Sequence, residues 1–122
     1  MTDNRTALVV DDVTTNRVLA RALLAKTGWQ VDEAADGAAA LGKAAGTAYR
    51  LILLDISMPG LSGEETCRAL RAGGASGTLI VAYTAHAFAD ERRRILAAGF
   101  DDILVKPVNL QSMAELMQRL SL

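Results

Sequence analysis

Five polar side chains stand where apolar segments of the chain end, and together they suggest phosphoryl chemistry. The set is Asp11, Asp12, Asp55, Thr84 and Lys106. Three carboxylates in one crevice would repel at neutral pH unless a cation lay among them, and oxygen ligands suit a hard divalent ion such as Mg²⁺. A lysine adds a positive charge and a threonine adds a hydroxyl donor. The group would therefore hold the oxygens of a phosphoryl group, provided that the fold brings its members together.

Each of these residues also has a simpler interpretation when it is taken alone. An acidic pair after a strand often opens a helix, where carboxylates cap free amides and suit the helix dipole. Asp55 would serve as a turn residue ahead of Pro59, Thr84 as the end of a strand, and Lys106 as a solvated loop lysine. The joint pattern favours a site over these separate roles.

The rest of the sequence predicts alternating strands and helices. Apolar runs rich in branched residues predict strands at 6–10, 29–34, 49–55, 77–84 and 102–106, the second near a sheet edge. Helical spacing and composition predict helices at 14–26, 37–46, 62–71, 89–99 and 109–120. Asp36 is expected to cap the second helix, and Ser62 with Glu65 forms a capping-box sequence for the third.

Two of the helices carry apolar stripes. In the helix at 14–26 the apolar positions are Val18, Leu19, Ala22 and Leu23. In the helix at 109–120 they are Leu110, Met113, Leu116, Met117 and Leu120. Because the methionines share a stripe with leucines, they are interpreted as core residues rather than as a cofactor site.

Five strand–helix units in succession predict a three-layer α/β fold, with a parallel sheet covered by helices on both faces. In such a sheet the carboxyl ends of the strands share one edge, where ligands bind in the crevice at which the strand order reverses. The five polar residues all follow strand ends, so this edge is where they are expected to meet.

Composition narrows the classes of protein. The chain has 122 residues, the size of one ordinary domain, and a formal net charge of -1. Nucleic-acid binding is not expected, since the nearest approach to a basic patch is Arg92–Arg94. Neither a membrane span nor an export signal is evident, so a cytoplasmic protein is expected. The single cysteine, Cys67, is interpreted as a partly buried helix residue.

The ordered motifs resemble the receiver domain of two-component response regulators, the CheY-like family. They are D-D after the first strand, D-x-x-M-P after the third, T-A after the fourth and K-P after the fifth. The resemblance covers nearly the whole chain and implies a single receiver domain over residues 1–122. It also implies the flavodoxin-like strand order 2-1-3-4-5 with five helices. The T-A-H-A sequence at His86, and Asn16–Arg17 after the acidic pair, are closest in style to hybrid-kinase and phosphorelay receivers.

The resemblance assigns a role to each site residue. Asp55 is implied to be the phosphoacceptor, which takes a phosphoryl group from phosphohistidine in a Mg²⁺-dependent reaction. Asp12, Asp55 and the backbone carbonyl of Ser57 would bind Mg²⁺ directly, and Asp11 would act through water. Lys106 would contact the phosphoryl oxygens, and the Thr84 hydroxyl would move in to meet them.

The family pattern extends to three further features. In the family, the positions of Ser57 and His86 flank the line of water attack on the acyl phosphate, although His86 taken alone is more simply an exposed residue at a helix start. Ala85 is small, as access to the site would require. The peptide between Lys106 and Pro107 resembles the cis bond of the family. The switch pair would be Thr84 and Ile103, where relatives have an aromatic residue in place of the isoleucine.

Partners follow from the same resemblance. A sensor histidine kinase or a histidine phosphotransfer protein would supply the phosphoryl group. The signal would leave by protein contact through the face formed by the segments at 89–99, 102–106 and 109–120, without nucleic acid or membrane. The domain would catalyse only its own phosphorylation and dephosphorylation.

Other classes of protein remain open on the sequence. A flavodoxin-like electron carrier would share the fold, although Asp11 and Asp12 would repel a flavin phosphate. A phosphatase with an aspartyl nucleophile would want a second acid at the position of Ser57. A degenerate receiver without activity would not need the complete set of polar residues.

Overall fold

The computed structural model describes residues 5–75, 77–85 and 87–122, and these form one sheet between two layers of helices. The strands are β1 (Thr6–Val10), β2 (Gln30–Ala34), β3 (Leu51–Asp55), β4 (Leu79–Thr84) and β5 (Asp102–Val105). The helices are α1 (Thr14–Lys26), α2 (Gly37–Gly46), α3 (Gly63–Ala72), α4 (Ala89–Ala97) and α5 (Leu110–Arg119). All strand pairs are parallel, in the order β2-β1-β3-β4-β5. The predicted fold class and strand order are confirmed.

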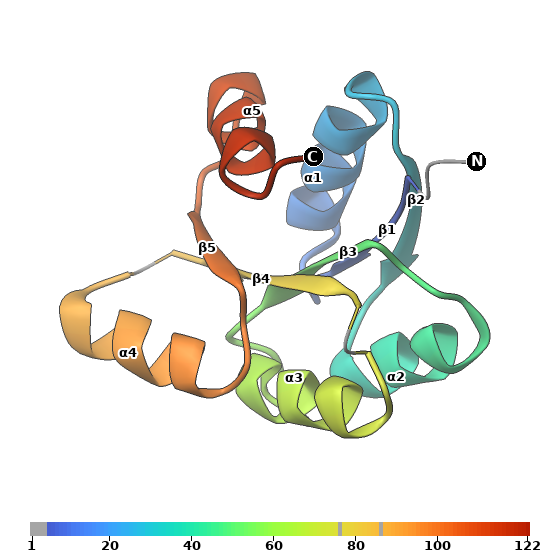
Figure 1. The fold of residues 1–122 in the computed structure, drawn as a ribbon, viewed down its shortest axis with the longest axis vertical. Coiled ribbons are helices and arrows are strands. Elements are labelled where there is room, and N and C mark those ends of the chain that lie inside the picture. The colour runs from blue at the N-terminus through green and yellow to red at the C-terminus, as the bar shows by residue number, and fades with distance from the viewer. Residues whose placement is uncertain (1–4, 76, 86) are drawn as a thin grey trace.

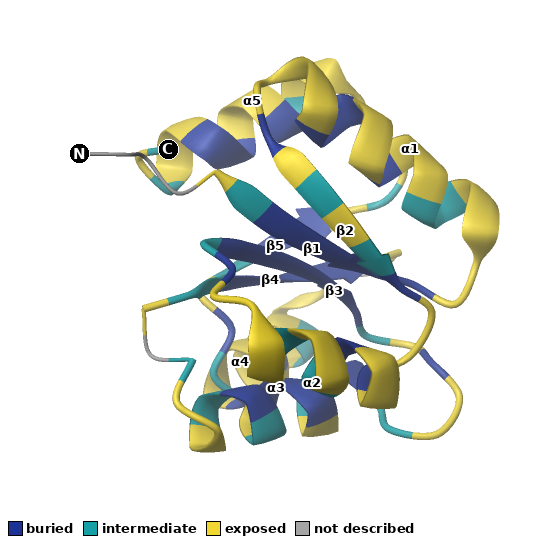
Figure 2. Ribbon diagram, turned by 90° about the vertical axis from the view of Figure 1, so that its right-hand side faces the viewer, coloured by how far each residue is buried: buried dark blue, intermediate teal, exposed yellow. Residues whose placement is uncertain are grey.

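The two helical layers are unequal. α1 and α5 cover one face of the sheet, and α2, α3 and α4 cover the other (Figure 1). Viewed from the side, the central strands are buried between the layers (Figure 2). All five residues of β3 are buried, whereas β2 at the edge buries only Ala34 completely. This explains why the β3 sequence is continuously apolar and the β2 sequence is mixed.

Alternation along each strand divides the core into two parts. Leu8, Ile52 and Ile80 belong to the cluster that includes residues of α2, α3 and α4. Val9, Leu53 and Val81 belong to the cluster that includes residues of α1 and α5. Successive side chains of a strand point to opposite faces, so each apolar strand supplies both clusters. Burial of each of these branched side chains, relative to its exposure in the unfolded chain, stabilises the fold by roughly 1.5–3 kcal/mol.

The predicted caps are present, but several strands are shorter than expected. Asp36 accepts a hydrogen bond from the Ala39 backbone N–H at 2.8 Å, and Ser62 with Glu65 forms a reciprocal capping box. The segments 49–50 and 77–78 and Lys106 lie outside the strands. Tyr49 precedes β3, and its hydroxyl donates to Asp32 Oδ2 on β2 at 2.6 Å.

The apolar stripe expected on α1 is only partly the buried face. Val18 and Leu19 are 49% and 43% exposed, and Ala22 is also exposed. The helix buries Ala20, Leu23 and Leu24 instead. Because Leu23 alone belongs to both sets, the face that contacts the sheet is rotated from the one inferred from the sequence.

The stripe on α5 is largely confirmed, with one correction at its start. Met113, Leu116 and Met117 are buried, so the methionines are core residues as predicted. Leu110 is 48% exposed, because it is the first residue of the helix and follows the Asn109 cap. Cys67 is fully buried rather than partly buried.

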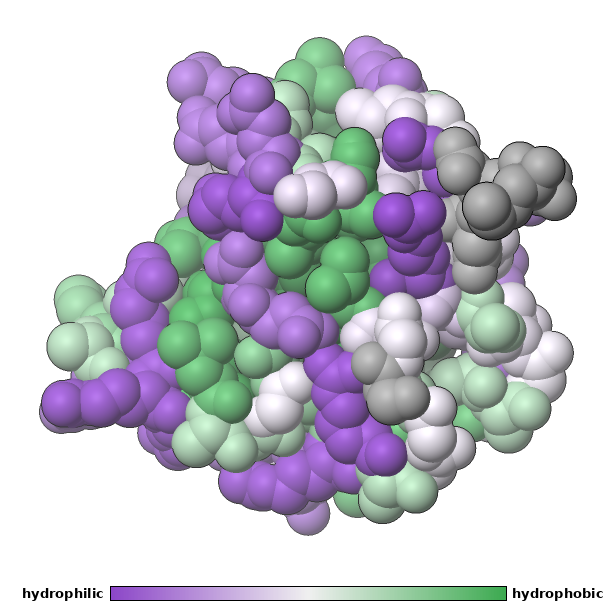
Figure 3. Space-filling model, viewed as in Figure 1, coloured by the Kyte–Doolittle hydropathy of each residue, from purple (hydrophilic) through white to green (hydrophobic). Residues whose placement is uncertain are grey.

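The surface is mixed in character. In the space-filling view from the same side as Figure 1, hydrophilic residues project over α4 at the lower left, and hydrophobic residues gather near the middle (Figure 3). Within the described part of the chain, no helix is both long enough and apolar enough to cross a bilayer.

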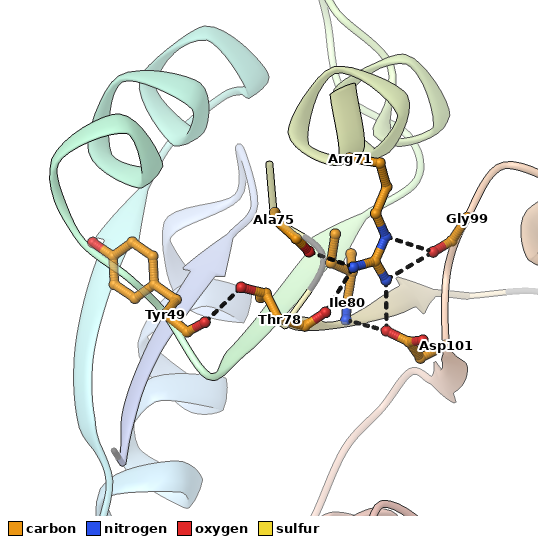
Figure 4. A network of polar contacts seen from close by, with 7 residues as sticks. All are labelled: Tyr49, Arg71, Ala75, Thr78, Ile80, Gly99 and Asp101. Atoms are coloured by element: carbon orange, nitrogen blue, oxygen red, sulfur yellow. Dashed lines mark hydrogen bonds and ion pairs between the residues drawn. The ribbon is translucent and has the colours of Figure 1, made fainter. Parts of the chain in front are cut away.

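At the amino-terminal edge of the sheet, Arg71 of α3 connects two loops (Figure 4). Its guanidinium donates to the backbone carbonyls of Ala75 and Thr78, each at 2.7 Å, and to the carbonyl of Gly99 at 2.9 and 3.1 Å. It also contacts Asp101 Oδ2 at 2.6 Å, and the same oxygen accepts the Ile80 N–H at 2.8 Å. The Arg71 side chain thus ties α3 to the loops that precede β4 and β5.

Replacing this arginine is expected to destabilise the fold substantially. An Arg71→Met variant keeps much of the apolar stem but removes the guanidinium donor from three backbone carbonyls, of which, among the described residues, only that of Ala75 keeps another donor, the Thr78 N–H at 3.3 Å. We expect the free energy of unfolding, measured by urea denaturation, to fall by about 3 kcal/mol. Arg93→Ala is the control: Arg93 pairs with Asp90 on α4 but is 77% exposed, and its loss should cost less than about 0.5 kcal/mol. Equal losses in the two variants would contradict the role given to Arg71.

Candidate functional site

The carboxyl ends of four adjacent strands lie side by side and bring the predicted residues together. β3 lies between β1 and β4, with Leu54 opposite Val10 and Asp55 opposite Tyr83. β5 lies next to β4 in turn, with Val105 opposite Thr84. Because all four strands are parallel, the residues that follow them emerge at the same edge of the sheet.

Three carboxylates cluster at this edge. Asp11, Asp12 and Asp55 each offer an oxygen, and these oxygens all lie within 4.8 Å of one another. Asp11 and Asp55 are buried, at 0% and 4% exposure, whereas Asp12 is exposed. The cluster is therefore open to solvent on the side of Asp12 and closed on the side of the sheet.

Lys106 supplies the positive charge of the site. Its ammonium nitrogen lies 3.3 Å from Asp11 Oδ2 and 3.3 Å from Asp55 Oδ1, and its side chain is 18% exposed. The backbone N–H of Lys106 donates to the Thr84 carbonyl at 2.8 Å, which ties the residue to the end of β4. The peptide bond from Lys106 to Pro107 is cis, as the family resemblance implies.

The electrostatics of the acidic cluster favour a cation. Burial raises the pKa of the Asp55 carboxyl to about 6; the Lys106 ammonium opposes this increase, and the Asp11 carboxylate adds to it. The Lys106 ammonium alone thus does not offset the cost of burying the Asp11 and Asp55 carboxylates next to Asp12. An additional positive charge at the cluster would favour the ionised form of Asp55.

The donor set fits Mg²⁺. Asp11 Oδ2 is buried and accepts no hydrogen bond from the described residues, although the Lys106 ammonium lies 3.3 Å away. A buried carboxylate oxygen normally has hydrogen-bond partners, so this oxygen has capacity for a metal-bound water. Carboxylate oxygens with an open solvent side match the way Mg²⁺ binds, through a few carboxylates while it retains several waters.

The loop after β3 is packed tightly against Asp55. The Ser57 N–H donates to Asp55 Oδ1 at 3.3 Å, so the backbone helps to orient the carboxylate. A Cβ atom at Gly63 would lie 2.3 Å from the Asp55 carbonyl oxygen, closer than any real contact. Glycine at position 63 therefore lets the start of α3 approach the end of β3.

Three further predicted residues lie on or directly after β4 and β5. Thr84 ends β4 and is 7% exposed, and Ala85 after it is exposed. Ile103 on β5 is 6% exposed and packs in the core cluster on the α4 side of the sheet. His86 lies outside the described residues.

Two neighbours of the site were not assigned a role by the sequence. Tyr83 is 1% exposed, and the Lys106 ammonium lies 4.5 Å from its ring centroid, a cation–π contact. Arg17 of α1 donates to the Asp11 carbonyl at 2.8 Å. Tyr83 lies inside an apolar strand and Arg17 lies on a helix, so neither could be recognised as a residue that follows a strand end. The only signal for Arg17 was the N-R sequence that it shares with Asn16, which resembles hybrid-kinase and phosphorelay receivers.

Comparisons with known proteins agree on one family. The sequence model of the response regulator receiver domain matches residues 7–119. The chain is 39% identical over 114 residues to the sensor protein GacS of Pseudomonas syringae pv. syringae, covering 90% of this chain and 13% of GacS. It is 41% identical over 103 residues to the sensor protein EvgS of Escherichia coli K12, covering 84% of this chain and 8% of EvgS. The chain thus spans a small part of these relatives.

Solved structures show the same likeness. Chemotaxis protein CheY4 of Vibrio cholerae superposes with a TM-score of 0.90 at 30% identity, covering 96% of this chain and 98% of CheY4. The receiver domain of the sensor histidine kinase PA1611 of Pseudomonas aeruginosa PAO1, described with a magnesium ion in its active-site cleft, gives a TM-score of 0.86 at 32% identity. The match covers 96% of this chain and 97% of the PA1611 receiver domain.

The family match therefore agrees with the site geometry and does not favour the flavin-carrier and phosphatase alternatives. Strand order, the acidic cluster at the carboxyl edge and the sequence matches all point the same way. The chain belongs to the response regulator receiver domain family of two-component signalling proteins.

Proposed function

We propose that Asp55 accepts a phosphoryl group from phosphohistidine in a Mg²⁺-dependent reaction, and that the domain then signals by protein contact. The observation that carries this proposal is the convergence at Lys106, whose ammonium contacts both Asp11 and Asp55 at 3.3 Å. Asp12 completes the acidic cluster on the solvent side. A buried carboxylate beside a lysine and an acidic pair is suited to accept an anion once its charge is compensated.

Each side chain has a distinct part in this reaction. Asp12, Asp55 and the Ser57 carbonyl would hold Mg²⁺ directly, and Asp11 would do so through water. The bound ion would supply the positive charge that lets two anions approach. Lys106 would hold phosphoryl oxygens, and the Thr84 hydroxyl would donate to them.

The transfer balances without another reactant. An Asp55 carboxylate oxygen forms a bond to phosphorus while the bond from phosphorus to the donor histidine nitrogen breaks. The histidine ring, which carries a proton on its other nitrogen, leaves with that electron pair as a neutral imidazole. Attack of water on the resulting acyl phosphate returns the Asp55 carboxylate and releases inorganic phosphate, so the domain catalyses only its own phosphorylation and dephosphorylation.

Three residues would set the lifetime of the acyl phosphate, and two others would carry the response. Ser57 and His86 would flank the path of the attacking water, and the small side chain of Ala85 would leave room for it. Thr84 and Ile103 would form the switch, in which a smaller packing change replaces the rotation of an aromatic ring. In support, Thr84 and Ile103 are both buried and lie on adjacent strands.

The partners we propose are a sensor histidine kinase or a histidine phosphotransfer protein, and a downstream protein. The sensor proteins GacS and EvgS and the receiver domain of the sensor histidine kinase PA1611, to which the chain is similar, support the first. For the second we propose the face of α4, β5 and α5, where Phe88, Leu96 and Val105 are 71%, 49% and 40% exposed. No role is proposed for nucleic acid or membrane; the place of action would be the cytoplasm, and residues 1–122 would act as one receiver domain.

The direct test is labelling of the purified protein by a small phosphodonor such as acetyl phosphate. With Mg²⁺ we expect one phosphoryl group per chain, and intact-mass measurement should show a gain of about 80 Da. In EDTA the rate should fall at least about 100-fold, because charge neutralisation accounts for most of this catalysis. Borohydride reduction should convert the phosphorylated aspartate into homoserine with loss of phosphate, and peptide mapping should find that homoserine at position 55. Labelling that is unaffected by EDTA would contradict the proposal.

A further inference from the structure

Arg17 links the acidic pair to the edge strand of the sheet. Its Nη1 donates to the backbone carbonyl of Asp11 at 2.8 Å, and its Nε donates to Glu33 Oε1 on β2 at 2.9 Å. The Arg17 and Glu33 side chains are only 17% and 26% exposed. One partly buried guanidinium therefore connects α1, the loop after β1 and β2.

We propose that Arg17, held by Glu33, is a positioning residue that fixes the peptide between Asp11 and Asp12 and so aims both carboxylates at the bound cation. This inference rests on the proposed Mg²⁺ site and concerns residues that the family motifs leave without a role. Arg17 acts through the backbone of Asp11, because its guanidinium donates to the Asp11 carbonyl and to the Glu33 carboxylate.

The local hydrogen bonds show why the Asp11 carbonyl matters. The Asp11 N–H donates to the Ala34 carbonyl at 3.1 Å, and Asp11 Oδ1 accepts the Val13 N–H at 2.9 Å. These contacts hold the start of the loop and the Asp11 side chain. The hydrogen bond from Arg17 holds the next peptide plane, which leads directly to Asp12.

Asp12 depends on that plane more than Asp11 does. Its side chain is exposed, so packing does not fix its direction, whereas the Asp11 side chain is fully buried. Rotation of the preceding peptide would move the Asp12 carboxylate away from the cluster of three oxygens. Partners that orient the ligands of a metal typically change its affinity by about 10–100-fold when they are removed.

Charge alone predicts the opposite effect of removing Arg17. A cation near the site repels Mg²⁺, so the loss of its charge would by itself tighten binding. In the structure Glu33 pairs with both Arg17 and Arg21, so the three side chains together keep one net positive charge. The sign of the change in metal affinity therefore separates positioning from simple electrostatics.

The test measures the Kd of Mg²⁺ for the unphosphorylated protein by titration calorimetry. We expect Arg17→Met to raise the Kd by about 10-fold. Arg17→Lys should raise it to a similar extent, because an ammonium lacks the planar fork that serves two acceptors at once. Arg21→Met is the matched control: Arg21 contacts the same Glu33 at 3.2 Å but is 55% exposed, and its Kd should stay within about 2-fold of wild type.

The outcomes separate three explanations. Urea unfolding in EDTA reports any purely structural role, and a loss of stability with unchanged Kd in both Arg17 variants would overturn the inference. Tighter binding in Arg17→Met would also overturn it. If Arg17→Met fails to fold, the Kd of Arg17→Lys decides. A wild-type protein that binds no Mg²⁺ would instead refute the proposed metal site itself.

Discussion

An Asp55→Asn protein is expected to take up no phosphoryl group under conditions in which the wild-type protein is fully labelled. The amide has nearly the same shape but cannot act as the nucleophile for an acyl phosphate. Asp55 is the buried carboxylate that contacts Lys106 and stands at the end of a fully buried strand. We expect the rate of labelling by acetyl phosphate, measured by intact mass, to fall more than about 1000-fold.

Asp12→Asn provides a graded comparison for this experiment. It keeps the nucleophile and removes one carboxylate of the acidic cluster. Labelling should therefore remain on Asp55 but should require a higher Mg²⁺ concentration for half-maximal rate. If Asp55→Asn were labelled at the wild-type rate, Asp55 would not be the acceptor, and the proposed function would lose its central residue.

The sheet could be predicted from the sequence because its signals are local. A continuous apolar run such as 51–54 has apolar side chains on both faces of its strand, and both faces are buried only when helices cover the two sides of the sheet. The helical segments between the strands act as crossover connections, which join parallel strands. The exact starts of β3 and β4 could not be predicted in this way. Tyr49 and Thr78 are suited to strands by type, but Thr78 donates its hydroxyl to the Tyr49 carbonyl at 2.7 Å in the structure.

The buried face of α1 shows where local reasoning is insufficient. Val18 and Leu19 are more apolar than Ala20, yet Ala20 is fully buried and they are exposed. A small residue lets the helix approach the sheet closely, and larger neighbours then remain outside. Which face is turned inward depends on the strands that receive the helix, and their positions are set by residues far away in the sequence.

The candidate site was predictable in its motif residues and not in their supports. Strand ends can be recognised along the chain, and parallel topology then places Asp11, Asp55 and Lys106 at one edge. Tyr83 differs, because an aromatic residue inside a strand is ordinarily a core residue. Its contact with Lys106 depends on the packing of β4 against β5 and on the path of the chain after Val105.

In the absence of metal, the fold is expected to lose stability between about pH 4 and pH 7 because of Asp55. Its pKa is raised from 3.8 to about 6 on folding, chiefly by burial. The folded state thus binds more protons than the unfolded state in this range, and the free energy of unfolding falls as the pH rises. Integrated over the range, the loss from this group is about 3 kcal/mol.

Asp55→Asn should therefore be more stable than the wild-type protein at pH 7 in EDTA, by about 2–3 kcal/mol or roughly 10 °C in Tm, and nearly equal to it at pH 4. Asp90→Asn, at a side chain that is 92% exposed, should show no such pH-dependent difference.

Added Mg²⁺ should raise the Tm of the wild-type protein and reduce the advantage of Asp55→Asn, since the ion binds the folded state through the carboxylate that this variant lacks. Thermal unfolding curves of the three proteins from pH 4 to pH 8, with and without Mg²⁺, measure both effects. Equal stability of wild type and Asp55→Asn at pH 7 in EDTA would show that the buried charge is already compensated within the protein, and the electrostatic reason for a bound cation would then fail.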